Sequence, residues 1–202
     1  MSRPPFGWVA ALVLLALTGC ATAPRLGGSG FLTSETGLTA STENGVQERA
    51  RALAPDDLAG IRCFVIAEPV INDKNLTDGQ ARVLAEDLKF NLTKALNAIR
   101  PVQASGQGCA LVKSAVAAVT KSNVLENLIL GVVILPVLPS NGAVALEAEV
   151  TAPGDGRSLA ALQWAKTGSP LSIIDGLTEI GQARGLIRDF GVRVAKLIMP
   201  PA

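Results

Sequence analysis

Glu147 and Glu149 are the residues whose spacing could support acid–base chemistry. They lie two positions apart in 143–151, where apolar and polar side chains alternate. Side chains two positions apart in a strand point to the same face, so the two carboxylates could act together as general acid and general base. The alternative is a solvated sheet face. Because aromatic residues that could stack on a sugar make up only 3% of the chain, the sequence favours the solvated face.

The residue types that other common catalysts need are missing. The sequence has no histidine, which excludes Ser-His-Asp and Cys-His nucleophiles, imidazole acid–base catalysis and His-based zinc sites. No lysine has a serine three positions before it, so a Ser-Lys nucleophile is excluded as well. The glycines of 27–30 follow no strand pattern and therefore form no phosphate-binding motif. We expect no enzyme activity, no catalytic residue, no metal and no cofactor.

Charged residues nearly balance in this chain. Eighteen Lys and Arg stand against 17 Asp and Glu, a formal net charge of +1. Such a balance gives no electrostatic footprint for nucleic acid or for an anionic membrane surface. We expect no nucleic-acid partner.

Cys20 is a candidate for lipid attachment. One positive charge at Arg3 precedes the apolar run 6–17, the layout of a secretory signal, and the run ends in Leu17-Thr18-Gly19-Cys20. This ending resembles the bacterial lipobox, which implies diacylation of the Cys20 thiol and cleavage before it, so that 1–19 is a lipoprotein signal peptide. A plain secretory signal is one alternative. A transmembrane anchor is another, but twelve apolar residues rise only about 18 Å against roughly 30 Å of hydrocarbon.

Residues 20–45 are expected to form a lipid-anchored flexible tether, because their Ala, Thr, Gly and Ser content cannot bury enough surface to offset ordering. Such a tether reaches about 25 to 30 Å. The pair Phe31-Leu32 is the exception that could dock on the domain. The rest, 46–202, is expected to form a single α/β domain that opens with a polar lead-in over 46–59.

The first half of this domain has a strand–helix–strand pattern. A β-branched run over 61–67 predicts a buried strand, and 109–119 predicts a second. Between them, Thr77 and Gln80 form a capping-box pattern at the start of a helix of about twenty residues. Its apolar face is a stripe at helical spacing made of Leu84, Leu88, Leu92, Leu96 and Ile99. A crossover through a helix favours parallel strands.

The second half predicts a hairpin and a helix. The alternating strand 143–151 is followed by an Asp-Gly turn signal at 155–156 and a return strand over 158–165. Apolar residues at a period of 3.6 then predict a helix over 176–199. The predicted fold is a two-layer α/β sandwich, with a mixed sheet of about four strands and two main helices packed on it.

Cys63 and Cys109 stand near the starts of the two parallel strands, at similar heights. An exported chain matures in an oxidising compartment, so these cysteines are candidates for a disulfide. Two buried free thiols on non-adjacent strands are the alternative, and the sequence leaves both open.

The segment 125–138 is unusual for its apolar content, because 128–138 has no polar side chain. It is too short to span a bilayer. It could be core, a loop dipping into the membrane interface, or an exposed patch for a protein partner. Under the last two readings the contact residues are Leu128, Ile129, Leu130, Val132, Val133, Ile134 and Leu135.

Several of these features together resemble an uncharacterised family of bacterial envelope lipoproteins, catalogued as a domain of unknown function. The resemblance rests on the lipobox, on Ser29-Gly30-Phe31-Leu32, and on a hairpin of the form Gly-x-x-Leu-Ala-Ala at 156–161. The family usually carries Asp-Ser where this chain has Ala152-Pro153, and more tyrosine. The resemblance implies an envelope location but no established activity. Ala21, in place of an inner-membrane retention Asp, implies the outer membrane, facing the periplasm, in a Gram-negative host.

The expected function is therefore non-catalytic. The sequence favours a lipid-anchored envelope protein that contacts the membrane through its anchor and binds an envelope protein partner as an assembly or transport accessory. A carboxylate-dependent enzyme is one alternative, and a binder of a small apolar ligand or lipid is another.

Overall fold

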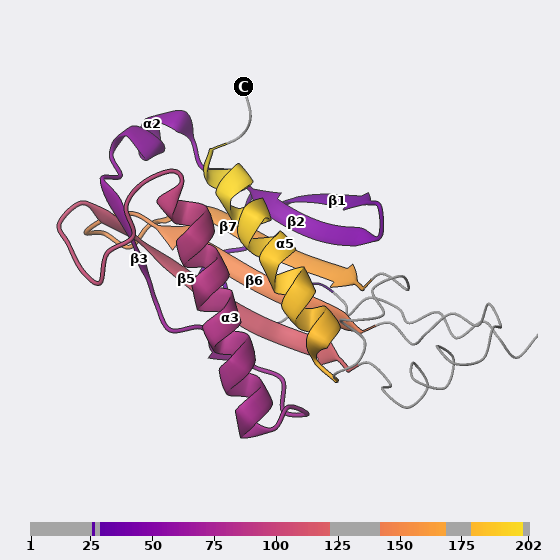
Figure 1. Cartoon of the computed structure of the whole chain (residues 1–202). Helices are drawn as coiled ribbons and strands as arrows, with labels where there is room; N and C mark the ends of the chain where they lie inside the picture. Colours follow the sequence, from indigo (N-terminus) through magenta and orange to yellow (C-terminus); the bar gives the residue numbers. More distant parts are fainter. Residues whose placement is uncertain (1–25, 27–28, 122–141, 169–178, 200–202) are drawn as a thin grey trace, which may run out of the picture.

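Strand pairing joins seven strands into one mixed sheet (Figure 1). The structure, a computed structural model, describes residues 26, 29–121, 142–168 and 179–199. The strands are β1 (Thr39–Glu43), β2 (Val46–Arg51), β3 (Cys63–Ile66), β4 (Val70–Ile71), β5 (Cys109–Thr120), β6 (Ala143–Thr151) and β7 (Ser158–Thr167). The helices are α2 (Pro55–Ala59), α3 (Asp78–Asn97) and α5 (Gly181–Ile198).

The strand order is β1-β2-β7-β6-β5-β3, with β4 also paired to β5. β3 and β4 run parallel to β5, and the other neighbours are antiparallel. The predicted parallel pair and the predicted hairpin of β6 and β7 are confirmed, as is the mixed α/β class. The prediction of about four strands is wrong, because β1, β2 and β4 were missed.

The missed strands β1 and β2 fall in the expected tether and the polar lead-in. Their sequences, TASTE and VQERAR, show no apolar alternation, so no periodic signal marks them. They become strands because β2 pairs along β7 and β1 pairs along β2. Asn44 and Gly45 join them with φ of 49° and 75°, the left-handed conformation that two-residue hairpin turns require.

Both long helices cover one face of the sheet (Figure 1). α3 begins with the predicted capping box, in which Thr77 Oγ1 accepts from the Gln80 amide and Gln80 Oε1 accepts from the Thr77 amide. Four leucines of α3 have no exposed surface: Leu84, Leu88, Leu92 and Leu96. α5 packs on β7 through Phe190, whose ring lies 5.8 Å from that of Trp164.

The crossing of α3 and α5 depends on Gly191. A Cβ atom at this position would lie 3.1 Å from the carbonyl oxygen of Asn91 on α3. Glycine therefore allows the two helix backbones to approach each other closely. The helices thus form a layer over one face, and Glu147, Glu149 and Gln163 are left to the opposite face.

Candidate functional site

The sheet face opposite the helices contains buried polar side chains. Glu147 and Glu149 of β6 are 3% and 0% exposed, and Gln163 of β7 is 1% exposed. The prediction of a solvated face for the two glutamates is therefore wrong. Their alternation along the strand was predicted correctly, but this face is covered rather than open to water.

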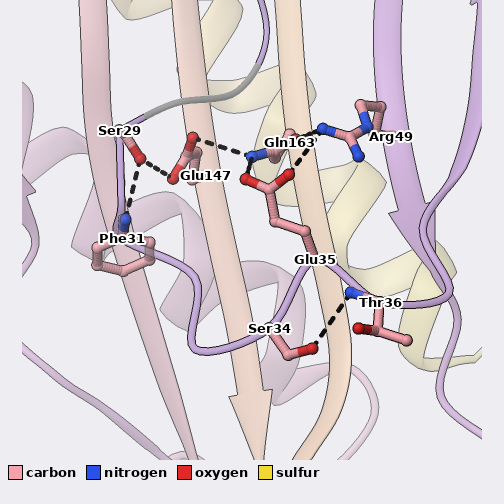
Figure 2. Close-up of polar contacts among 8 residues, drawn as sticks. All are labelled: Ser29, Phe31, Ser34, Glu35, Thr36, Arg49, Glu147 and Gln163. Carbon is pink, nitrogen blue, oxygen red and sulfur yellow. Dashed lines mark hydrogen bonds and ion pairs between the residues drawn. The ribbon is translucent and has the colours of Figure 1, made fainter.

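Residues 29–36, here called the strap, lie across this face (Figure 2). Ser29 Oγ donates to Glu147 Oε2 at 2.5 Å and accepts from the Phe31 amide at 3.1 Å. Gly30, between them, has a φ of 70°, which a side-chain-bearing residue rarely adopts. The strap therefore turns sharply where it meets the first carboxylate.

Thr33 of the strap satisfies the second carboxylate. Its amide donates to Glu149 Oε1 at 3.2 Å and its hydroxyl donates to Glu149 Oε2 at 2.7 Å. Lys113 Nζ of β5 lies 3.7 Å from the same Oε2. A buried carboxylate is tolerated when it accepts hydrogen bonds and has a cation nearby, and Glu149 has both.

Glu35 connects the strap to β2 and β7 (Figure 2). Its carboxylate accepts from Arg49 Nη1 at 2.9 Å and from Gln163 Nε2 at 3.1 Å. Gln163 also donates to Glu147 Oε1 at 3.4 Å and accepts from Arg49 at 3.1 Å. One amide side chain thus links the carboxylates of Glu35 and Glu147, and the network spans three neighbouring strands.

Arg51 of β2 holds the far end of the strap. Its guanidinium donates to the carbonyl oxygen of Thr36 and, at 2.6 Å, to Ser158 Oγ of β7. The strap is therefore held at both ends. Ser29 bonds to Glu147 of β6 at one end, and Arg51 of β2 bonds to Thr36 at the other.

Burial raises the pKa of Glu147 above that of an ordinary glutamate. The hydrogen bond from Ser29 lowers this pKa, the nearby Glu35 carboxylate raises it, and the hydrogen bond from Gln163 lowers it. A raised pKa suits a general acid. Here, however, the carboxylate oxygens already accept from the strap and from Gln163, so the arrangement holds the strap over the acids.

A groove of about 580 Å³ lies away from these acids, between the β1–β2 hairpin and α5. Arg193 on α5 donates to both carboxylate oxygens of Glu48 on β2, at 2.8 and 2.6 Å, and this hydrogen bonding lowers the pKa of Glu48. Lys166 and Asp189 form a second ion pair at 2.8 Å. The groove is lined by Ser41, Glu43, Asn44, Val46, Glu48, Trp164, Lys166, Asp189, Val192, Arg193 and Lys196.

Cys63 and Cys109 face each other in the register of β3 and β5. The structure joins them in a disulfide, with an S–S distance of 1.95 Å and Cα atoms 4.3 Å apart. The alternative of cysteines on non-adjacent strands does not describe this sheet, because β3 and β5 are neighbours.

The other predicted site residues lie outside the described residues. These are Cys20 and the apolar set Leu128, Ile129, Leu130, Val132, Val133, Ile134 and Leu135. In the part of the chain that the structure describes, no group of three Cys, Asp or Glu side chains could hold a metal ion. No helix of that part has the length and hydropathy to cross a membrane.

Sequence reasoning missed the strap residues Ser29, Thr33 and Glu35 as partners of the buried acids. Ser29 and Glu147 are separated by 118 positions, and no local pattern reports such a contact. One local signal was present: Asn44-Gly45 is typical of a two-residue hairpin turn. That turn would have placed β1 and β2 in the sheet and shortened the expected tether.

Comparisons with known proteins give structural similarity alone. No family model matches the chain, and no curated protein matches it significantly in sequence. It is similar to a PelC dodecamer from Paraburkholderia phytofirmans, with 12% identity and a TM-score of 0.49 over 75% of this chain and 97% of that one. A single-substitution variant of that PelC dodecamer has 14% identity and a TM-score of 0.44, over 76% of this chain and 98% of that one. A Xanthomonas campestris protein of DUF330, a domain of unknown function, has 12% identity and a TM-score of 0.40, over 68% of this chain and 84% of that one. All three scores are below 0.5, so no activity, partner or assembly is carried over from these proteins to this chain.

Proposed function

We propose that this chain is a lipid-anchored protein of the bacterial envelope that binds an envelope protein partner and has no catalytic activity of its own. Cys20 is the proposed site of lipid attachment, and 1–19 the signal peptide. In a Gram-negative host the protein faces the periplasm from the outer membrane. The strap on the sheet is the observation that carries this proposal.

The strap shortens the tether between lipid and domain. Ser29 is already fixed to Glu147, so the free tether ends there rather than at residue 45. From Cys20 to Ser29 the chain reaches about 30 Å when fully extended, and about 17 Å as a random coil. A domain held at this distance stays beside the leaflet, where it meets partners that are themselves in the membrane.

The occupied carboxylates favour docking over catalysis. Glu147 accepts from Ser29 and Gln163, and Glu149 accepts from Thr33. A substrate could reach them only after the strap had left. Their role under this proposal is to hold the strap.

The proposed partner contact is the apolar segment 128–135. Residues 128–138 have no polar side chain, and an apolar run of this kind suits contact with a partner when it is exposed. We propose 128–135 as the partner contact on this ground.

The test is photo-crosslinking in intact cells from a photoreactive residue at Ile129 or Val133. Phe90, which lies on α3 and is 65% exposed, is the matched control for an exposed apolar position elsewhere. A discrete protein adduct from 129 or 133, absent at 90, supports the proposal. Adducts to lipid alone would instead indicate membrane dipping, and the absence of adducts would assign the segment to the core.

A carboxylate-dependent enzyme is the second candidate, and the raised pKa of Glu147 is the observation that favours it. Glu147→Gln and Glu149→Gln separate the two functions. If a variant keeps its stability and its strap but no longer performs the protein's function in cells, the enzyme is favoured. If the variant still performs that function, the docking function is supported.

A further inference from the structure

β1 forms an open edge of the sheet (Figure 1). Among the described residues its only strand partner is β2, and all five of its side chains are exposed. The outer backbone groups of such a strand are available to pair with another chain.

The opposite edge is covered at β3. The Phe64 amide of β3 donates to the Pro101 carbonyl, and the Gln103 amide donates to the Phe64 carbonyl, both at 2.9 Å. The segment 101–103 therefore occupies the outer side of β3 at this point. Beyond it, β4 has only two residues, so among the described strands β1 is the longer edge that can accept an added strand.

The edge at β1 has little of the usual protection against pairing. Its sequence TASTE has no lysine and no proline and carries one charge, at Glu43, and its register with β2 is continuous over all five pairs. The hairpin is also held firmly, because Glu48 of β2 forms a two-point ion pair with Arg193 of α5. β1 is thus an ordered and accessible template.

We propose that β1 pairs antiparallel with β1 of a second copy of this chain, in a register centred on Ser41. Full overlap of two five-residue strands places Ser41 opposite Ser41, Ala40 opposite Thr42, and Thr39 opposite Glu43. The single charged residue of each strand then faces a threonine hydroxyl rather than another carboxylate. Like charges directly opposite would destabilise the pair, and this register avoids them.

A second copy fits this edge because of where the strap lies. Antiparallel pairing of identical edges creates a two-fold axis perpendicular to the sheet. The helices of both copies then lie on one face and both straps on the other. Both anchors can therefore enter one membrane, and this last point alone rests on the proposed anchoring.

Cysteine crosslinking tests the register directly. The test uses three variants of the full chain: Ser41→Cys, Thr42→Cys and, on the exposed side of α3, Phe90→Cys. The cell fraction that contains the protein is oxidised with copper phenanthroline, and the yield of dimer is compared among the variants. Directly opposed residues have Cβ atoms about 4.5 to 5.5 Å apart, and diagonal ones about 7 to 8 Å. The proposal predicts at least about ten times more dimer from Ser41→Cys than from either control, by the distance a disulfide requires.

A mixture of Ala40→Cys and Thr42→Cys chains should also crosslink, whereas each alone should not. Thermal unfolding of each variant verifies that it is folded. The unsubstituted chain gives the background dimer yield, because a Cys20 thiol that is not acylated would also be oxidised, and this background is subtracted. Equal dimer yields from Ser41→Cys and Phe90→Cys in folded protein would overturn the proposal. A maximum at Thr42→Cys would overturn the Ser41 register.

Discussion

The hydroxyl of Ser29 donates to the buried carboxylate of Glu147, 118 positions further along the chain. This contact fixes the segment that follows the proposed lipid site to the middle of the sheet. The strap, the length of the tether and the burial of Glu147 and Glu149 all depend on such contacts.

Thr33→Val should loosen the strap. The substitution removes the hydroxyl that donates to Glu149 Oε2 at 2.7 Å, and a buried acceptor that loses a donor costs about 1 to 2 kcal/mol. We expect a lower free energy of urea unfolding and faster hydrogen exchange over 31–36. Thr36→Val on the same strap is the control, since this exposed side chain makes no hydrogen bond in the described structure. Equal effects of the two substitutions would contradict the role of Thr33.

Glu147→Gln should change how stability depends on pH. Burial raises the pKa of Glu147 in the folded state, so the folded protein binds this proton more tightly than the unfolded chain does. The stability that this proton contributes is present below about pH 4.5 and is lost as the pH rises through the raised pKa. Glutamine has no proton to lose, so the difference in unfolding free energy between wild type and variant should vary with pH over that window. Glu86→Gln, at a side chain that is 69% exposed, should keep the wild-type dependence.

Removal of the disulfide should lower stability strongly. Cys63 and Cys109 are 46 positions apart, and a loop of this length corresponds to about 4 kcal/mol on the chain-entropy model. The double variant Cys63→Ala/Cys109→Ala should therefore unfold at a lower temperature than the wild type. A reductant should lower the unfolding temperature of the wild type toward that of the double variant. An unchanged wild-type transition under full reduction would contradict a structural role for the bond.

Gly191→Ala should destabilise the helix layer. Its new methyl group would lie 3.1 Å from the carbonyl oxygen of Asn91. Overpacking of this kind costs about 1 to 3 kcal/mol, which outweighs the helix preference of alanine, about 1 kcal/mol. Gly79→Ala in α3 is the matched control, because no heavy atom lies within 4 Å of the added group and alanine favours helix by about 1 kcal/mol. Urea unfolding should thus change in opposite directions for the two variants.

The sequence predicts the local parts of this fold well and the long-range ones poorly. The capping box of Thr77 and Gln80 and the leucine stripe of α3 depend on residues three or four positions apart, so their patterns are visible in the sequence. The alternation of β6 is also local. What covers Glu147 is not local, because it depends on Ser29 at the other end of the chain. The same strand pattern is compatible with a solvated face and with a strapped one.

The missed strands β1 and β2 have a related cause. β1 is polar, and β2 adds only Val46 and Ala50 to the edge of the core. The two strands are held by the pairing of β2 with β7 and by the ion pair of Glu48 with Arg193. Strand preference in such segments comes from pairing and not from composition. Only the Asn44-Gly45 turn reported them locally.

Intact-mass spectrometry of the protein purified from the membrane fraction tests the central claim most directly. We predict a mature chain that begins at Cys20 and carries the added mass of acyl chains, and a Cys20→Ala variant that keeps residues 1–19 and gains no such mass. A wild-type protein that carries no acyl mass, or that is cleaved elsewhere, would contradict the proposed lipid anchor.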